Sequence, residues 1–321
     1  MSEPKILQNT DIETQNTDIL TVYTANEWMV MAKNMPDDRK LYDDIWSEGE
    51  TCFLYGGPGA GKSLFAVQIG IHIAQTEAVL YCDFELSPKQ FRKRYRIRGG
   101  CEFDFPKKFY RAEFTKDIEF ESTGLIQSID SNAKAIGAKV IMIDNISWII
   151  ENSEKGDVAG TFMKKLSQLK RNSGYSILTV AHTPKRDESN PINLTDMAGS
   201  MRLQNFIDSS FAIVESAKEV GMRYLKQTKC RSEEKAYGFD SVLVMRLEQR
   251  DDAFTGFTRI GTAVETDHLK RPNEDERQNK KNKCLEYLAE GKTYSEIQTL
   301  TGLSKGAISK YKNEQEAVTP F

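Results

Sequence analysis

The stretch GGPGAGKS at residues 56–63 restricts the fold of this chain more than any other feature. It follows the apolar run TCFLYG (51–56) and leads into a helical pattern over 62–75. It fits G-x-x-x-x-G-K-[ST], in which a glycine-rich turn directs backbone N–H groups at a phosphate and the next helix N-terminus adds a favourable dipole. The sequence therefore predicts a strand, a phosphate-binding loop and a helix, in that order.

This loop supplies separate groups for a nucleotide and for a metal ion. Lys62 would neutralise the β- and γ-phosphate oxygens, and the Ser63 hydroxyl would ligate Mg²⁺. We therefore expect ATP and Mg²⁺ as cofactors. The nucleotide site would comprise Gly56, Gly57, Pro58, Gly59, Ala60, Gly61, Lys62, Ser63 and Leu64.

A later apolar strand, KVIMID (139–144), ends in an acid that can hold the metal. Asp144 would bind Mg²⁺ through a water molecule. In many ATPases with such a strand the next residue is a glutamate that activates water, but here it is Asn145. An amide cannot take up a proton, so either hydrolysis is weak or the base comes from elsewhere in the chain.

The predicted strand after the phosphate loop, 78–85 (AVLYCDFE), offers that base. It ends in Asp83 and Glu85. Because ligands of open α/β sheets bind at the carboxyl ends of the strands, Glu85 can point into the same crevice as Lys62.

Strand and helix patterns alternate through the middle of the chain, which predicts an α/β fold with a mostly parallel sheet covered by helices. After residue 200 strand patterns follow one another closely and suggest hairpins that extend the sheet. The predicted strands are 51–56, 78–85, a short one at 109–114, 139–144, 175–181, 210–214, 222–228, 241–248 and 257–265, and the predicted helices are 62–75, 87–98, 124–137 and 157–172.

The phosphate loop, the strand end F-E-L-S and the Asp144 strand without a following glutamate together resemble the RecA-like ATPases, especially DnaB-type hexameric helicases and RepA-type plasmid helicases. The resemblance covers roughly residues 50–265. It implies a RecA-like P-loop core in which Glu85 is the water-activating base. It also implies a homo-oligomer, expected to be a hexamer, that hydrolyses Mg-ATP and acts as a helicase for plasmid or mobile-element DNA.

Two further segments extend this resemblance. YSILTVAHTPK (175–185) is similar to the family's sensor strand, which lies between the phosphate-loop strand and the Asp144 strand, so His182 would contact the γ-phosphate. LKQTKCRSEEKAYG (225–238) resembles the family's K-x-R segment. The resemblance implies that Lys229 and Arg231 act on the ATP site of the neighbouring subunit.

The same resemblance places the loops 147–157 and 183–198 at a central channel for single-stranded DNA. Lys185 and Arg186 would contact DNA there. The basic cluster FRKRYRIR (91–98) is interpreted as a solvated helix face or a subunit contact in preference to a DNA contact.

The C-terminal run CLEYLAEGKTYSEIQTLTGLSKGAISKYK (284–312) has three helical patterns and a turn at Gly302 and Leu303. It resembles the helix-turn-helix of resolvase-like and regulator proteins, except that Gln298 stands where that family has a small residue. Duplex DNA would then contact Ser304, Lys305, Ser309, Lys310 and Lys312. The alternative is a helical protein-interaction tail.

These patterns divide the chain into five parts. We expect a flexible tail over 1–20, a helical lead-in over 21–48, the ATPase domain over 49–268, a charged linker over 269–282 and the helix-turn-helix over 283–317.

Composition limits the possible partners and location. With 39% hydrophobic and 28% charged residues and a net charge of −3, the chain has no global attraction to nucleic acid, so DNA contacts require local basic patches. We find no apolar run that could span a bilayer and no signal-peptide pattern, which predicts a cytoplasmic protein without membrane partners. Two functions stay open: a helicase-like motor, or an ATP-switched DNA-binding regulator that does not unwind strands.

Overall fold

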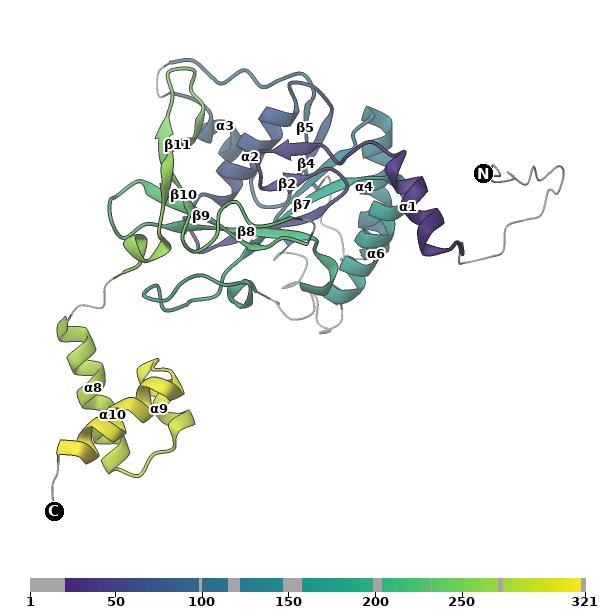
Figure 1. Ribbon diagram of the computed structural model, residues 1–321. Coiled ribbons are helices and arrows are strands. Elements are labelled where there is room, and N and C mark those ends of the chain that lie inside the picture. Colours follow the sequence, from purple (N-terminus) through teal and green to yellow (C-terminus); the bar gives the residue numbers. More distant parts are fainter. Residues whose placement is uncertain are drawn as a thin grey trace. The chain divides into compact units, whose positions relative to one another are not determined.

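The computed structural model describes residues 21–97, 100–114, 122–146, 158–198, 204–231, 233–270 and 274–318 (Figure 1). The predicted tail 1–20 and the channel loop 147–157 lie outside these residues. The chain divides into two units, Met1–Asp38 and Arg39–Phe321. In the first unit, helix α1 (Ala25–Lys33) begins at a capping box, in which the Thr24 hydroxyl accepts from the Glu27 N–H and the Glu27 carboxylate accepts from the Thr24 N–H.

A nine-stranded sheet forms the core of the second unit among the described residues, in the order β11-β10-β9-β8-β3-β7-β6-β4-β5. The strands from β8 to β5 are parallel, and β9, β10 and β11 continue the sheet as antiparallel hairpins. Both the mostly parallel sheet and the predicted place of the sensor strand, β7 between β3 and β6, are confirmed. The strands are β3 (Thr51–Gly56), β4 (Val79–Asp83), β5 (Phe109–Ala112), β6 (Val140–Asp144), β7 (Ser176–His182), β8 (Ser209–Glu215), β9 (Met222–Lys229), β10 (Val242–Gln249) and β11 (Thr255–Ala263).

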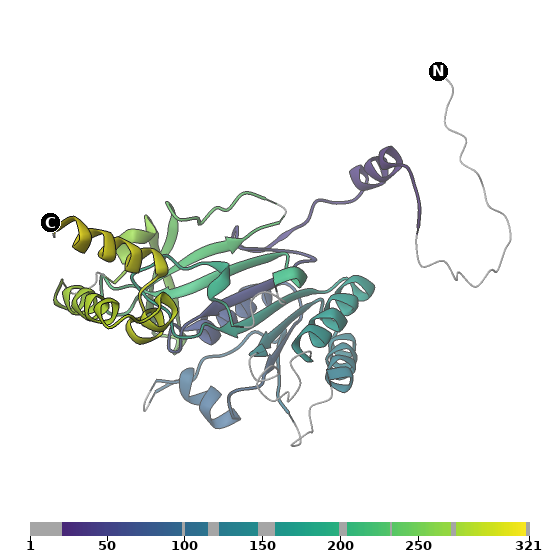
Figure 2. The same ribbon diagram turned by 90° about the horizontal axis from the view of Figure 1, so that it is seen from below.

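Helices cover both faces of this sheet, which explains why its central strands are apolar runs without alternation. Along β3, Cys52 and Leu54 face one hydrophobic cluster, whereas Phe53 and Tyr55 face the other. The first cluster includes α2 (Lys62–Ile73); the second includes α4 (Ser122–Ile136) and α6 (Val158–Ser173), which lie side by side (Figures 1 and 2). The carboxyl ends of the parallel strands therefore open at one edge between two covered faces.

The helical lead-in predicted over 21–48 is only partly helical. Residues Lys40–Tyr42 and Trp46–Ser47 instead form a two-stranded antiparallel ribbon, β1 and β2. Its side chains Leu41 and Trp46 are buried in the same cluster as α2. Three apolar side chains in so short a ribbon are too few to show whether their spacing is that of a strand or of a helix. Burial against the core determined the structure instead.

The charged linker predicted over 269–282 is also helical for most of its length, because α8 (Glu274–Ala289) begins at Glu274. Glu, Lys, Arg and Gln are strong helix formers, so a scarcity of apolar residues does not prevent a helix. Lys281 pairs with Glu314 at 2.7 Å, which adds a contact between α8 and α10.

The C-terminal residues form three helices, α8, α9 (Tyr294–Thr301) and α10 (Lys305–Val318). Gly302 ends α9 with φ 71°, a left-handed conformation that favours glycine. Gln298, the departure from the resembled pattern, is exposed and takes no part in the packing. A small core joins the three helices and contains Cys284, Ile297, Ile308 and Tyr311. Within the described part of the chain, we find no helix long and apolar enough to cross a membrane.

Candidate nucleotide site

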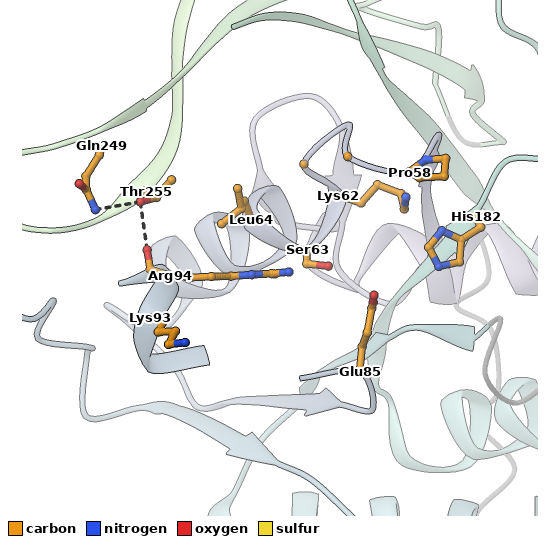
Figure 3. Close-up of a pocket in the computed structure, with 12 residues that line it drawn as sticks. Pro58, Lys62, Ser63, Leu64, Glu85, Lys93, Arg94, His182, Gln249 and Thr255 are labelled. Atoms are coloured by element: carbon orange, nitrogen blue, oxygen red, sulfur yellow. Dashed lines mark hydrogen bonds between the residues drawn. The ribbon is translucent and has the colours of Figure 1, made fainter. Parts of the chain in front are cut away.

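A cavity of about 560 Å³ opens at the carboxyl edge of the sheet, beside the phosphate loop (Figure 3). Its walls come from the loop, from the ends of β4 and β7, from α3 (Pro88–Arg94) and from the β10–β11 hairpin. The lining residues are Pro58, Gly59, Gly61, Lys62, Ser63, Leu64, Glu85, Lys93, Arg94, His182, Gln249 and Thr255. The sequence predicted seven of these positions as site residues besides Glu85, and the remaining four were missed.

The loop 56–63 has the strand–loop–helix context that the sequence predicts. Gly61 has φ 96°, and a Cβ there would lie 2.6 Å from the ring of Phe257, so both the conformation and the space require glycine. No side chain caps the start of α2. Its first-turn N–H groups lack helical acceptors, which suits an anion.

Buried Arg223 on β9 holds the backbone of this loop, although nothing in the sequence pattern singled it out. Its Nε donates to the carbonyl of Ala60 at 3.3 Å, and its guanidinium pairs with Glu215 at 2.9 Å. The loop backbone is therefore fixed by a side chain from a strand on the far side of β8.

Lys62 is buried at the base of the loop. Its ammonium donates to the carbonyls of Gly56 at 3.0 Å and Gly57 at 2.9 Å. Burial lowers the pKa of Lys62, and the carboxylates of Asp144 and Glu85 work against that shift. The Lys62 ammonium is therefore close enough to both carboxylates, Asp144 and Glu85, to be stabilised by their negative charge.

Asp144 at the end of β6 is buried and only partly satisfied. The Tyr81 hydroxyl donates to its Oδ2 at 2.6 Å, whereas its Oδ1 has no hydrogen-bond partner among the described residues. Burial raises the pKa of Asp144 to about 6, against the opposing effect of hydrogen bonds from Tyr81 and Ser63. A buried carboxylate oxygen without a partner, next to the Ser63 hydroxyl, is a donor set that fits Mg²⁺.

Glu85 reaches the cavity because a turn after β4 fixes its backbone. The Asp83 carboxylate accepts from the N–H groups of Glu85 at 3.2 Å and Leu86 at 2.9 Å. Arg111 on the neighbouring strand β5 holds the other oxygen of Asp83 at 3.0 Å. Asp83 therefore positions Glu85, a role that sequence reasoning did not assign.

His182 ends β7 beside the start of the phosphate loop, where it is the register partner of Gly56. The next N–H, of Thr183, donates to the Gly56 carbonyl at 3.0 Å. Figure 3 shows the His182 ring and the Glu85 carboxylate facing the space in front of Lys62.

Asn145 lies between these two side chains. Its Nδ2 donates to Glu85 Oε2 at 3.0 Å and lies 3.1 Å from His182 Nε2. The sequence pattern shows only that Asn145 stands where many related sites have a water-activating glutamate, and it assigns the amide no role of its own. The signal that could have found its role is its position at the end of a strand flanked by the strands of Glu85 and His182.

The far wall of the cavity contains groups that the sequence did not predict. Thr255 on β11 donates to the Arg94 carbonyl at 3.0 Å, and the Gln249 amide lies 3.3 Å from the Thr255 hydroxyl (Figure 3). Lys93 and Arg94 belong to the basic cluster 91–98, which was interpreted as a solvated face or a subunit contact. In the structure, both residues line the cavity from α3, whose N-cap is Ser87.

Lys229 and Arg231 are not at this cavity. Lys229 is the last residue of β9, and Arg231 follows it. This end of β9 pairs with the first residues of β8 and so lies at the amino edge of β3. The six residues of β3 span about 20 Å. Arg231 pairs with Asp208 at 3.0 Å, and Lys229 donates to the Gln204 carbonyl at 2.7 Å. From this position neither residue reaches the cavity of its own chain.

The two basic residues after His182 differ in exposure. Lys185 is exposed. The Arg186 guanidinium is held inside its own loop by Asp196 at 3.6 Å and by the Asn190 carbonyl, and its side chain is 13% exposed. Lys185 is therefore the more accessible residue for the predicted DNA contact.

Comparison with known proteins agrees with this geometry. Residues 24–188 match the AAA_25 family, described as an AAA domain, and they make up just over half of the 321 residues. The chain belongs to the AAA_25 family. DNA repair protein RadA of Streptococcus pneumoniae is 25% identical over 189 residues, which are 57% of this chain and 40% of that protein. The chain thus spans less than half of the length of this curated relative.

The fold of this AAA_25 chain also matches a solved structure. The KaiC-like protein PH0186 of Pyrococcus horikoshii OT3 superposes with a TM-score of 0.52 and 17% identity, covering 69% of this chain and 100% of that one. At this identity the likeness concerns the fold alone. The expected RecA-like P-loop ATPase core is thereby confirmed.

Proposed function

We propose that this protein hydrolyses Mg-ATP and uses the energy as a motor on DNA, in the manner of a plasmid or mobile-element helicase. One observation carries the proposal: Lys62, Glu85 and His182, from three different elements, line a single cavity beside the phosphate loop. A binding protein that only holds nucleotide has no need of a carboxylate opposite the lysine.

In this mechanism Glu85 accepts a proton from the water that attacks the γ-phosphorus. Lys62 and the first-turn N–H groups of α2 stabilise the charge on the phosphate oxygens. His182 contacts the γ-phosphate and connects its presence to the loop 183–198. When bound between Ser63 and Asp144, Mg²⁺ would neutralise the β- and γ-phosphate oxygens.

The proposed assembly is a ring, with a hexamer as the expected size. Its support is the position of Lys229 and Arg231 at the edge of the sheet opposite their own cavity. In a head-to-tail ring, such an edge meets the cavity edge of the next subunit. The two side chains would then add positive charge to the neighbour's transition state.

DNA as the partner is supported by three features. RadA, the relative noted above, is named as a DNA repair protein. Lys185 is exposed on the loop after His182. In the C-terminal helices, α10 presents Lys305, Lys310 and Lys312 to solvent, while Ser304 caps it by accepting from the Ala307 N–H. We propose that α10 is the recognition helix of a helix-turn-helix that binds duplex DNA, with half-buried Ser309 on its margin.

Mg²⁺-dependent ATP turnover, measured with and without single-stranded DNA, tests the motor. We expect turnover that single-stranded DNA stimulates, together with opening of a forked duplex. A protein that assembles on duplex DNA with ATP but never opens the fork would contradict the motor and favour the alternative, an ATP-switched regulator. Absence of turnover under all these conditions would also contradict the motor.

The duplex contact has its own test. Combined Lys305→Ala and Lys310→Ala should weaken duplex binding and lower the salt dependence by about one unit of slope per lost phosphate contact. Lys292→Ala in the same three-helix unit is the matched control, because its ammonium pairs with Glu290. Equal duplex affinity in the two variants would contradict DNA recognition by α10 and favour a protein-interaction tail.

A further inference from the structure

Asn145 joins three neighbouring strands at the point where the proposed chemistry takes place. It follows β6, while Glu85 follows β4 and His182 ends β7. The residue is buried, with 5% of its surface exposed. One atom, Nδ2, makes both contacts, at 3.0 Å to Glu85 Oε2 and 3.1 Å to His182 Nε2.

The chemistry of these partners fixes the orientation of the carboxamide. A carboxylate offers only acceptors, so the atom of Asn145 that faces Glu85 must be the nitrogen. That nitrogen carries two protons, one for Glu85 and one for His182. His182 Nε2 must then accept, which leaves the ring proton of the neutral imidazole on Nδ1.

We propose that Asn145 is a positioning residue that orients the base Glu85 and holds His182 in the Nδ1–H tautomer. The inference rests on the proposed ATPase function and adds a residue to it. An amide suits this place because it donates twice and accepts no proton at neutral pH. A glutamate or aspartate here would set a second carboxylate against Glu85 instead.

The proposal predicts a specific kinetic signature. Asn145→Leu keeps a similar volume but removes both donors, so we expect kcat to fall about 10- to 100-fold, as for the loss of hydrogen bonds to a charged group. KM for ATP should change less than about threefold, because Lys62 and the phosphate loop are unaltered. Combining Asn145→Leu with His182→Leu should cost less than the product of the two single effects, since both remove one shared contact.

Thr179→Val is the matched control. Thr179 is buried on β7, next to Ile143 of β6, and its hydroxyl has no hydrogen-bond partner in the described part of the chain. This change alters a buried polar side chain of the same sheet but touches neither Glu85 nor His182. We expect wild-type kcat for Thr179→Val. If its kcat falls as much as that of Asn145→Leu, the Asn145 effect would be explained by a general disturbance of the sheet, and the proposal would be overturned.

The tautomer supplies a readout that does not depend on activity. The chain has three histidines, so ¹⁵N-histidine labelling gives three imidazole patterns, and His182→Gln identifies that of His182. At a pH where the ring is neutral, we expect the Nδ1–H form for His182 in the wild type and a mixture in Asn145→Leu. An Nε2–H form in the wild type would overturn the proposal without any variant.

The outcomes separate this inference from the function on which it depends. A wild type without ATP turnover would defeat the proposed function, whereas the tautomer measurement would still test the contact. A wild type that turns over ATP, with Asn145→Leu equally fast, would defeat the inference alone. If Asn145→Leu does not fold, Asn145→Ser replaces it, and an unchanged kcat in that variant would also overturn the proposal.

Discussion

The two ends of strand β3 carry different electrostatic arrangements. At the carboxyl end, Lys62, Asp144 and Asn145 are buried. Lys62 lines the cavity, and Asn145 contacts Glu85 and His182, which also line it. At the amino end, Asp208 forms ion pairs with Lys170 at 2.6 Å and with Arg231 at 3.0 Å, and the Arg231 side chain is 58% exposed. The difference suggests that one end performs chemistry within the chain, whereas the other is open to a neighbouring subunit.

The largest expected effect comes from removing Glu85, the proposed base at the carboxyl end. Glu85→Gln keeps the size of the side chain but cannot take up a proton, so turnover should fall by about 10²- to 10⁴-fold. Nucleotide binding, measured by titration with a fluorescent ATP analogue, should be retained. Glu113→Gln is the control, since Glu113 is a nearby carboxylate that pairs with Arg111 and does not line the cavity. Wild-type turnover in Glu85→Gln would remove this residue from the mechanism.

Lys62→Ala should come next, with turnover lower by about 10²- to 10³-fold, as for the loss of one preorganised donor to a developing charge. Unlike Glu85→Gln, it should also weaken ATP binding, because Lys62 faces the phosphates before reaction. The same titration checks this difference. Equal affinity of Lys62→Ala and wild type would mean that Lys62 does not contact bound phosphate.

Arg231→Ala at the amino end should lower turnover about 10- to 100-fold, in proportion to one charge-assisted hydrogen bond, since Lys229 remains. The loss should occur only at protein concentrations where subunits assemble. Its exposed pair with Asp208 contributes less than about 1 kcal/mol, so the variant should fold. Lys235→Ala, in the same segment, is the control. An identical loss in dilute, monomeric protein would contradict action on a neighbour.

The smallest effect concerns stability and compares two aspartates, one at each end. Burial raises the pKa of Asp144 to about 6. For Asp208, burial also acts to raise the pKa, but hydrogen bonds from Lys170 and the Thr51 N–H outweigh it, and the pKa is lowered. The two carboxylates should therefore affect folding in opposite directions.

Above pH 6 both the folded and unfolded forms of Asp144 are ionised, and the folded state carries a penalty of up to about 3 kcal/mol. Asp144→Asn should raise the free energy of unfolding there, and the gain should vanish as pH falls toward 4. Asp208→Asn should lower it at pH 7, with the loss fading as pH drops through the lowered folded pKa. Urea unfolding at several pH values measures both. The same sign for both variants would contradict the contrast.

The sequence predicted most of the fold and the centre of the site. The phosphate loop, the strand ends at Asp144 and Glu85 and the order of the sensor strand depend on local patterns that a parallel sheet brings to one edge. The cavity wall at Gln249 and Thr255 could not be predicted, because it forms when a hairpin near the end of the sheet contacts α3. Similarly, Arg223 supports the loop through a strand pairing that no motif encodes.

Asn145 shows the limit of motif reasoning most clearly. In many ATPases a glutamate that activates water follows the aspartate of this strand. The amide of Asn145 shows only that this position does not supply the base. Its two contacts depend on the register of β6 between β4 and β7, which becomes visible only when the strands are paired. Sequence motifs identify Glu85 and His182, but the pairing of β6 with β4 and β7 places Asn145 in contact with both.

Mixing two impaired variants tests the contrast between the ends of β3 most directly. Glu85→Gln lacks its own base but keeps Arg231, whereas Arg231→Ala keeps its base but no longer offers the Arg231 guanidinium to a neighbour. In a randomly mixed head-to-tail ring at equal amounts, about a quarter of the sites should combine a Glu85 subunit with an intact Arg231 neighbour. We predict that ATP turnover rises well above the sum of the separate variants and peaks near equal mixing. No recovery at any ratio, in rings shown to exchange subunits, would contradict the division between a chemical end and an assembly end.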